Sequence, residues 1–431
     1  MHRLGPSFLA LGIFICAGVP LSATPPQSER APSKRQQNKL VQEFLELDAW
    51  LSPDRERREL ILEELANVPP LSDRQLKSWL KSIGKLWSKG PQLEKSGGRA
   101  YLWEEEKRGL YIVGGNTRSP KGLLIAMHGG GVGSGDAGPA ASNWALPADA
   151  HDLLMIAPQV LEKTECGWTD AGTEEFVMQL IERACRTWDI DPERVYLAGH
   201  SMGGYGSWTL GAHHADRVAG LAPSAGAPTA FTGPSGTLEG IVEGVIPNLF
   251  NVPIRIYQSD DDVQVPPDAN RCAVKALEAA RAIYGGYDFE YWEVTGRGHG
   301  RPPGGNQALF DKIADKLRVA RPSQLVWQPT LTWKKDFYWL RWEQPVLNTV
   351  LVAKLDREKN EVRIQLPVAS TKGLSLWLDS ATLDLSTEVR IFLNEQQVWS
   401  GVPTPTLQSL LRSAERGDRG HLYPVLIQLE L

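Results

Sequence analysis

The chain has 431 residues and a formal net charge of −5, and its apolar fraction (42 %) and charged fraction (23 %) are ordinary for a soluble globular protein. This length is long for one domain, and each of two or three domains could bury its own core. Charges of both signs are mixed along the chain without a basic patch, which argues against nucleic acid as a partner.

The N-terminus has the features of a secretory signal. Arg3 precedes an apolar stretch at residues 8–19 that is too short to span a bilayer. We therefore expect a signal peptide over residues 1–23, export to the periplasm or the medium, and no stable membrane insertion. A retained N-terminal anchor is the alternative, because Leu21 is a poor match to the small residue expected before a cleavage site.

Three cysteines follow the signal, namely Cys166, Cys185 and Cys272. An odd number excludes a complete disulfide framework, and the spacing fits no metal site. Two interpretations remain. Either one bridge joins Cys166 to Cys185 in an oxidising compartment, or the cysteines are small buried apolar side chains.

Residues 24–100 are predicted to form a linker and a small helical module. Pro, Ser, Gln and charged residues dominate residues 24–38, which is typical of a flexible linker. From there to residue 87 apolar residues recur at helical spacing, and the pair Pro69 and Pro70 separates two of the predicted helices. Nothing in this module suggests chemistry.

The pattern changes at Tyr101. Two strand-like segments joined by a charged turn predict an antiparallel hairpin, and the continuous apolar run at residues 123–127 is typical of a strand buried on both faces. Strands and helices then alternate, which predicts an α/β domain over residues 101–320 with a mostly parallel sheet and helices on both faces. The hairpin is expected at 101–104 and 109–113, later strands at 153–157, 195–198, 218–223, 254–258 and 289–294, and helices at 174–188, 203–212, 270–284 and 307–319.

A separate β-rich module is predicted over residues 325–431. Short alternating segments at 337–342, 362–366, 374–378 and 389–393 predict a meander of antiparallel strands, followed by a helix at 407–411 and a last strand at 423–431. Five tryptophans on predicted strands of this module could form a carbohydrate-stacking face. We expect them instead to form the core of a small sandwich: Trp327, Trp333, Trp339, Trp342 and Trp377.

The segment Gly-His-Ser-Met-Gly at residues 199–203 matches the pattern G-x-S-x-G. It follows a predicted strand and opens a predicted helix, where a sharp turn can hold a serine hydroxyl above the edge of a sheet. Glycines at both ends are needed because the backbones of strand and helix approach closely there. Ser201 is therefore the candidate nucleophile, against the alternative of a glycine-rich turn with an idle serine.

A serine hydroxyl is a poor nucleophile at neutral pH and needs a base, which in turn needs an orienting carboxylate. Of the histidines after Ser201, the pair at 213 and 214 lies near the far end of the helix that starts at the nucleophile, and His421 lies in the C-terminal module. His299 remains, in a glycine-rich loop directly after a strand. Three carboxylates follow the strand at 254–258 and are candidates for the acid: Asp260, Asp261 and Asp262.

The remaining site residues follow from the same chemistry. His-Gly-Gly-Gly at residues 128–131 directly follows a buried strand and matches a loop that supplies oxyanion donors. We expect the oxyanion hole to use the amide of Met202 with those of Gly129 or Gly130, and His128 to be structural. Trp168 and His200 are the expected substrate-binding residues; Trp168 stands between a strand end and a helix.

Together these motifs resemble the α/β-hydrolase superfamily over about residues 101–318. The likeness is strongest to the phospholipase/carboxylesterase and polyhydroxybutyrate-depolymerase-like esterase branch, which includes predicted peptidases and dienelactone-hydrolase-like proteins. The resemblance implies an α/β-hydrolase fold and an Asp followed by two variable residues and Val-Pro, a spacing that favours Asp262 over Asp261. The His-Gly pair that commonly opens this acid loop is Gln258–Ser259 here.

The resemblance implies acyl transfer from a small-molecule or carbohydrate-linked ester through an acyl-enzyme on Ser201, with no metal or organic cofactor. A serine peptidase of the prolyl-oligopeptidase-like type and an inactive hydrolase-like binding protein are the alternatives. Residues 133–138 also match the dinucleotide-binding pattern G-x-G-x-x-G, but they do not open directly after a strand. A helix at residues 231–251 is expected to pack on the sheet, with a substrate-specific lid as the alternative.

Overall fold

The computed structural model describes residues 31–95, 97–367 and 371–429. The expected signal peptide and the first part of the linker lie outside these residues. Within them, no helix is both long enough and apolar enough to cross a membrane.

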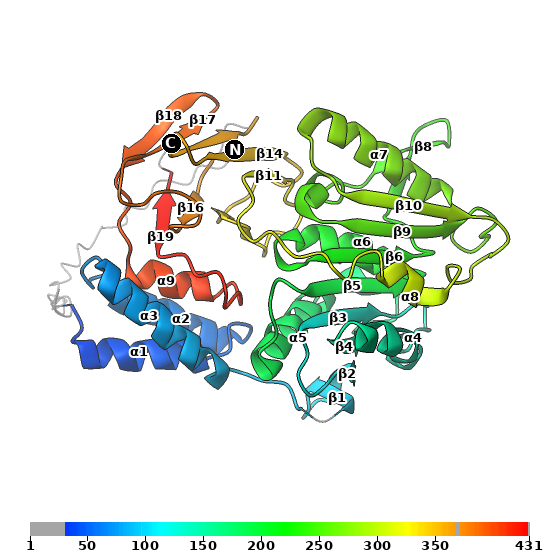
Figure 1. Ribbon diagram of the computed structural model, residues 1–431, viewed down its shortest axis with the longest axis horizontal. Coiled ribbons are helices and arrows are strands. Elements are labelled where there is room, and N and C mark those ends of the chain that lie inside the picture. Colours follow the sequence, from blue (N-terminus) through cyan, green and yellow to red (C-terminus); the bar gives the residue numbers. More distant parts are fainter. Residues whose placement is uncertain (1–30, 96, 368–370, 430–431) are drawn as a thin grey trace, which may run out of the picture.

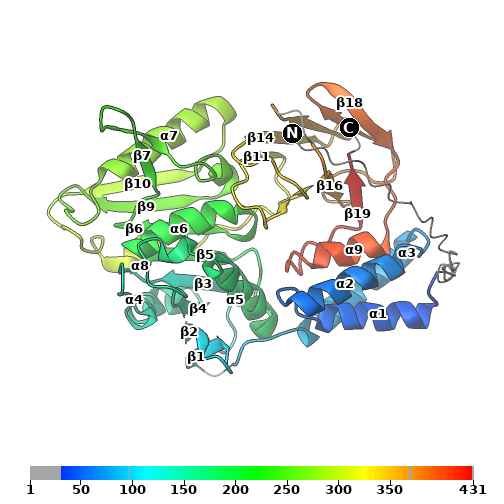
Figure 2. The same cartoon turned by 180° about the vertical axis from the view of Figure 1, so that it is seen from behind.

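The N-terminal module is a helical bundle, as predicted, with α1 (Lys34–Glu46), α2 (Ser52–Leu65) and α3 (Asp73–Leu86). Ser33 and Ser72 begin α1 and α3 with reciprocal capping contacts to the glutamine three residues later. A fourth helix, α9 (Leu407–Ala414), comes from the other end of the chain and shares the buried core of the bundle. Figures 1 and 2 show α9 beside α2, so a helix from the C-terminal module completes the N-terminal bundle.

The central unit is an eight-stranded sheet in the order β1-β2-β4-β3-β5-β6-β9-β10. The first two strands form the predicted antiparallel hairpin, and the pairs from β4 to β10 are parallel. All residues of β3 and β4 are buried, as expected for central strands of a parallel sheet. The bounds are β1 (Gly98–Trp103), β2 (Arg108–Gly115), β3 (Gly122–Met127), β4 (Leu153–Pro158), β5 (Val195–His200), β6 (Gly220–Ser224), β9 (Ile254–Ser259) and β10 (Phe289–Val294).

Helices cover both faces of this sheet (Figure 1). One buried core holds side chains of α5 (Thr173–Trp188), α6 (Met202–His213) and α7 (Asp268–Tyr284), and a second core holds those of α4 (Ala137–Ala150) and α8 (Gly305–Phe310). The sequence pattern did not predict α4. The helix expected at residues 307–319 is wrong in length, because the chain leaves α8 in short turns after Phe310.

The helix expected at residues 231–251 is also wrong. The segment forms a hairpin of β7 (Ala230–Thr232) and β8 (Leu238–Ile241), followed by the short 3-10 helix η4 (Pro247–Asn251). Gly236 has a φ of +78° in the hairpin turn, a conformation that breaks a helix. The apolar residues in the second part of the segment still pack inward, since Val245, Ile246 and Leu249 are buried.

The C-terminal module consists of two sheets rather than a simple meander. One has the order β11-β14-β15-β17-β18 and contains a parallel pair, β15 with β17; the other has the order β12-β13-β16-β19. Four of the five tryptophans are buried in the core as expected, whereas Trp333 is 38 % exposed. The bounds are β11 (Gln324–Trp327), β12 (Asp336–Phe337), β13 (Leu340–Trp342), β14 (Leu351–Asp356), β15 (Glu361–Gln365), β16 (Leu374–Leu378), β17 (Val389–Leu393), β18 (Gln396–Gly401) and β19 (Val425–Gln428).

A buried ion pair joins the C-terminal module to the sheet unit. Arg318 Nη1 lies 2.7 Å from Asp418 Oδ2, both side chains are 2 % exposed, and Nη1 also donates to the Asp216 carbonyl. Burial would raise the pKa of Asp418, but Arg318 and His421 outweigh it and hold the pKa well below its usual range. The sequence predicts a helix through Arg318, whereas α8 ends at Phe310 and Arg318 lies beyond it, in the contact with the C-terminal module.

Replacing Arg318 with methionine is expected to lower the free energy of unfolding by about 3–5 kcal/mol, because Asp418 would remain buried without its cation. Urea unfolding at neutral pH measures this. The control is Lys359→Met, which removes an exposed pair with Asp356 and should cost no more than about 1 kcal/mol. Equal losses in the two variants would contradict the importance given to the buried pair.

Candidate active site

Ser201 lies in a strained turn between β5 and α6, with φ 61° and ψ −125°. Such a conformation costs about 1–3 kcal/mol in a non-glycine residue and persists only where its surroundings enforce it. The flanking glycines are required: a Cβ on Gly199 would lie 2.3 Å from the Gly203 carbonyl oxygen, and one on Gly203 would lie 2.1 Å from that of Met127. The motif therefore forms the sharp strand–turn–helix that its spacing predicts.

The loop after β3 passes beside this serine. A Cβ on Gly129 would stand 3.1 Å from the Cβ of Ser201, and Gly130 has a φ of +131° that favours glycine. Met202 is the first residue of α6, and the first amides of a helix have no partner within the helix. The two segments predicted to supply oxyanion donors thus meet at Ser201.

His128 supports this loop from within the protein. The side chain is buried, and its Nδ1 lies 2.8 Å from the Gly129 carbonyl oxygen while its Nε2 accepts a hydrogen bond from the amide of Val160 at 3.1 Å. These partners require the neutral tautomer with the proton on Nδ1, and burial lowers the pKa of His128 accordingly. Its position agrees with the expected structural function.

Trp168 corrects one expectation about the site. Its side chain is fully buried, and its indole N–H donates to the His128 carbonyl at 3.2 Å. The indole also packs against α6, where a Cβ on Gly206 would lie 2.6 Å from it. Trp168 therefore supports the loop and the helix around Ser201 and offers no surface to a substrate, contrary to the prediction that it lines the cleft.

His299 and Asp262 contact each other. His299 Nδ1 lies 2.8 Å from Asp262 Oδ2, and the Asp262 carboxylate has no exposed surface. The other oxygen, Oδ1, accepts from the amides of Gln264 and Val265, each at 2.9 Å. Burial raises the pKa of Asp262, but the hydrogen bonds from Val265, His299 and Gln264 outweigh it and keep the pKa below its usual value.

The other two candidate acids hold the loop that carries His299. Asp261 Oδ1 accepts from the Ser259 hydroxyl and from the amides of Arg297 and Gly298, and Asp260 Oδ2 accepts from the Thr295 hydroxyl at 2.8 Å. Neither carboxylate is among the hydrogen-bond partners of His299 in the part of the chain that the structure describes. His299 therefore contacts Asp262, the carboxylate that the spacing before Val-Pro favours.

His200 precedes the nucleophile and lies against the candidate base. The ring centroids of His200 and His299 are 4.9 Å apart, and His200 Nδ1 is 3.2 Å from the hydroxyl of Ser224. Burial, with a further contribution from His299, lowers the pKa of His200 to about 4. His200 is therefore neutral at pH 7, a small polar surface next to Ser201.

The histidines set aside in the sequence are engaged elsewhere. His213 and His214 both contact Glu174, at 2.9 and 3.2 Å, at the far end of α6 from Ser201. His421 lies between Asp418 and Glu193 in the contact with the C-terminal module. These positions agree with the elimination that left His299.

Two residues that were not predicted as site residues support Asp262 from the protein interior. The Gln258 side chain is fully buried; its Nε2 donates to Asp262 Oδ2 at 3.2 Å, and its Oε1 accepts from Asn270 Nδ2 at 2.9 Å. Asn270 belongs to α7 and also donates to the Gly226 carbonyl. The sequence offered one indication for Gln258: it stands where the resembling branch commonly has a histidine. It offered none for Asn270.

Gln258→Leu is expected to lower kcat about tenfold with little change in KM, because the side chain orients Asp262 from the protein interior. Steady-state kinetics on a p-nitrophenyl ester separates the two constants. Gln328→Leu is the control, since Gln328 is also a buried glutamine bonded to Gly244 and Asn348 but lies in the C-terminal module. A loss of kcat that is the same in both variants would show a general packing defect instead.

The cysteines and metal ligands can be assigned within the described residues. There, Cys166, Cys185 and Cys272 are free, so the alternative of a bridge from Cys166 to Cys185 is wrong. Cys185 is buried as a small apolar side chain, and burial raises the pKa of its thiol to about 12, whereas Cys166 is exposed. No three His, Cys, Asp or Glu side chains in this part of the chain gather as metal ligands would.

The sheet order, the helices on both faces and the serine turn after β5 together decide the fold. It is an α/β-hydrolase fold. No protein-family model matches the chain. The chain is 28 % identical over 131 residues to a bifunctional acetylxylan esterase/xylanase from Neocallimastix patriciarum, and 28 % identical over 117 residues to a poly(3-hydroxyalkanoate) depolymerase C from Paucimonas lemoignei.

These matches cover 29 % and 25 % of this chain, and only 18 % and 28 % of the two relatives. They confirm the resemblance to the carboxylesterase and depolymerase-like branch inferred from the motifs. Among solved structures, a phospholipase/carboxylesterase from Dyadobacter fermentans is 17 % identical, with 51 % of this chain and 99 % of that chain covered, at a TM-score of 0.34. The fold assignment rests on the sheet order and the serine turn, and not on this superposition.

Proposed function

We propose that the protein is a serine hydrolase that cleaves carboxylic esters through an acyl-enzyme on Ser201. The observation that carries this proposal is the strained turn at Ser201, with the Gly129 loop beside it and with His299, which contacts Asp262, packed against the adjacent His200. The esterase and depolymerase names of the two sequence relatives support esters as the substrate class. A small-molecule or carbohydrate-linked ester is the substrate we infer.

In the proposed reaction the Ser201 Oγ attacks the ester carbonyl carbon while His299 Nε2 takes the hydroxyl proton. The amides of Met202 and Gly129 or Gly130 donate to the negatively charged oxygen of the tetrahedral intermediate. When the C–O bond to the alcohol breaks, His299 returns the proton to the leaving alcohol. Water, deprotonated by His299, then attacks the acyl-enzyme; as the bond to Ser201 Oγ breaks, His299 returns the proton to that oxygen, which releases the carboxylic acid and free Ser201.

Asp262 has a positioning function in this scheme. Its Oδ2 accepts the hydrogen bond from His299 Nδ1, which leaves Nε2 free to act as the base and stabilises the imidazolium that forms. The low pKa of Asp262 keeps the carboxylate ionised at neutral pH. Neutral His200, next to His299, is the proposed contact for the polar part of the ester.

A substrate panel tests the proposal. Short-chain and long-chain p-nitrophenyl esters, acetylated xylan, a feruloyl ester and a chromogenic peptide are incubated with the protein, with Ser201→Ala as the blank for each. We expect Ser201-dependent release of acid from at least one ester and none from the peptide. Cleavage of the peptide alone would favour the peptidase alternative, and no cleavage of any substrate would favour the inactive binding protein.

A further inference from the structure

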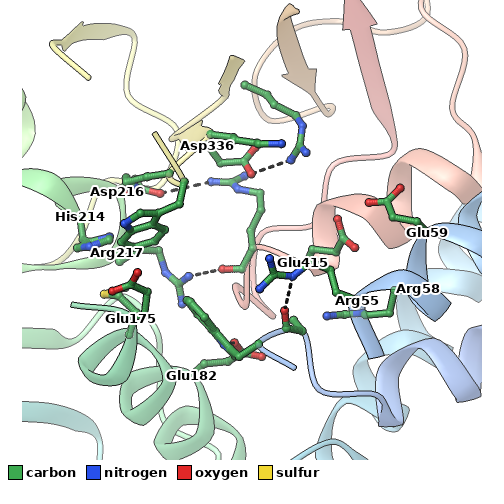
Figure 3. A pocket seen from close by; sticks show the side chains of 18 residues that line it. Arg55, Arg58, Glu59, Glu175, Glu182, His214, Asp216, Arg217, Asp336 and Glu415 are labelled. Atoms are coloured by element: carbon green, nitrogen blue, oxygen red, sulfur yellow. Dashed lines mark hydrogen bonds and ion pairs between the residues drawn. The ribbon is translucent and has the colours of Figure 1, made fainter. Parts of the chain in front are cut away.

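A cavity of about 410 Å³ lies where three parts of the chain meet (Figure 3). The helical bundle contributes Trp50 and Arg58, the sheet unit contributes His214, and the C-terminal module contributes Trp333 and Arg416. His214 follows the last residue of α6, whereas Ser201 precedes the first, and a helix of 12 residues is about 18 Å long. The cavity is therefore separate from the candidate active site, and its size is typical of sites for small ligands.

Four arginines on its walls lack a close carboxylate. Arg55 donates to the Ala49 carbonyl, and Arg217 donates to the carbonyls of Arg416 and Gly417. The nearest carboxylate oxygen to Arg416 belongs to Asp216, at 3.9 Å. Within the described residues, Arg58 has no carboxylate oxygen within 4.0 Å.

Two of these arginines are buried, Arg58 with 5 % and Arg416 with 8 % of its surface exposed. The Nε atoms of both, and Nη1 of Arg416, have no hydrogen-bond partner among the described residues. A buried guanidinium without a paired anion is costly, and its planar set of donors matches the oxygens of a carboxylate or a phosphate. The two side chains line the cavity from the bundle and from the C-terminal module, and each guanidinium packs over an aromatic ring, that of Arg58 over Phe44 and that of Arg416 over Tyr423.

Most carboxylates on the walls are already paired with other cations. Asp216 pairs with Lys334 at 2.7 Å, and Asp336 pairs with Arg341 at 2.8 Å. Glu182 and Glu59 pair with arginines outside the cavity. Only two glutamates on the walls lack a partner closer than 3.9 Å within the described residues: Glu175 and Glu415. The unpaired groups therefore comprise four cations and two anions, an excess of positive charge.

The cavity also has an aromatic wall. The rings of Trp50 and Trp333 meet edge to face with centroids 6.5 Å apart, and Trp333 is the partly exposed tryptophan of the C-terminal module. The Trp50 indole N–H donates to Glu182 at 3.1 Å, which fixes that ring. A flat apolar surface beside unpaired arginines suits a ligand with an anionic group on a compact organic body.

We propose that this cavity binds a small organic oxyanion, with its carboxylate or phosphate group on Arg58 and Arg416 and its body against Trp50 and Trp333. Because the walls come from three parts of the chain, the bound anion would hold the bundle and the C-terminal module on the sheet unit. The inference does not depend on the proposed ester hydrolysis, since none of the residues around Ser201 lines the cavity.

Titration calorimetry and thermal unfolding of the full chain test the proposal with three probes: glucuronate, its neutral counterpart glucose, and inorganic phosphate. We expect glucuronate or phosphate to bind with a Kd of about 1 mM or tighter and to raise Tm, and glucose to do neither. Binding of glucuronate assigns the site to carboxylates, and binding of phosphate assigns it to phosphates. No binding of either anion, or equal binding of glucose, would overturn the proposal.

Variants locate the binding. Arg58→Met and Arg416→Met are expected to weaken the anion about tenfold or more, because each removes a charge-assisted contact. Arg55→Gln changes an exposed side chain and is therefore expected to fold even if the two buried substitutions prevent folding. It should weaken binding of the anion about threefold. Lys359→Met, at an exposed residue of the C-terminal module, and Ser201→Ala should bind as the wild type does. Unchanged affinity in the cavity variants would overturn the proposal.

Discussion

Replacing Ser201 with alanine is expected to lower kcat for a short p-nitrophenyl ester by at least about 10⁴-fold, with the fold intact. The substitution removes the atom that forms the acyl-enzyme, while the oxyanion donors and the substrate surface remain. The residual rate, measured against the uncatalysed reaction, reports what those donors contribute alone.

The control for this prediction is Ser235→Ala, at an exposed serine in the hairpin between β7 and β8. That variant should keep the wild-type rate. Thermal unfolding of both variants distinguishes a lost nucleophile from a lost fold. If Ser201→Ala kept a substantial part of the wild-type kcat, another residue would carry the reaction and the proposed mechanism would be wrong.

Asp262→Asn is expected to lower kcat about 10⁴-fold, whereas Asp261→Asn should cost about tenfold or less. The two carboxylates are neighbours in sequence but have different partners. Asp262 contacts His299, and an asparagine there would present a donor or a weaker acceptor to Nδ1 and stabilise the wrong tautomer. Among the described residues, Asp261 accepts only from backbone amides and a hydroxyl, and the asparagine carbonyl oxygen can still accept those bonds.

Parallel assays of the two variants on one ester measure this difference. Thermal unfolding of each variant is the accompanying control, since Asp262 also accepts two amides in its own loop. Equal losses in kcat would assign the effect to the loop as a whole. A larger loss in Asp261→Asn would transfer the acid function to that residue.

Much of the central unit could be predicted because its elements are determined by local pattern. Continuous apolar runs specify β3 and β4, and amphipathic spacing specifies α5 and α7. The errors have long-range causes. Arg318, which the sequence pattern places in a helix, pairs instead with Asp418, a hundred residues later, and no local pattern reports a contact of that separation.

The contact of α9 with the N-terminal bundle is another feature outside local pattern. Its leucines form an apolar face that the sequence shows, but the partner of that face is set by the fold of the whole chain. The same holds for Trp333, which was expected in the core with the other tryptophans but lies between β11 and β12 at the surface of a cavity. Periodicity shows that one face of a helix or strand is apolar, but it does not identify the part of the chain that packs against that face.

In the candidate site, too, some features could be predicted from local sequence and others could not. Ser201, His299 and Asp262 could be proposed from the sequence because their chemistry requires particular residue types after particular strands, and the structure brings His299 and Asp262 into contact. The orientation of Trp168 was not, since its neighbours in sequence do not reveal that its indole lies beneath the Gly129 loop. Gln258 and Asn270 were missed because an amide that supports a carboxylate from the interior has no sequence signature of its own.

The most direct test of the central claim is covalent labelling of the wild-type protein with a fluorophosphonate, followed by mass spectrometry of the labelled peptide. An activated serine attacks such a reagent as it attacks an ester, whereas an ordinary serine hydroxyl does not. We predict one label per chain, on Ser201, lost in Ser201→Ala and strongly slowed in His299→Ala. Absence of the label, or a label on a different serine, would contradict the proposal that Ser201 is the nucleophile of an ester hydrolase.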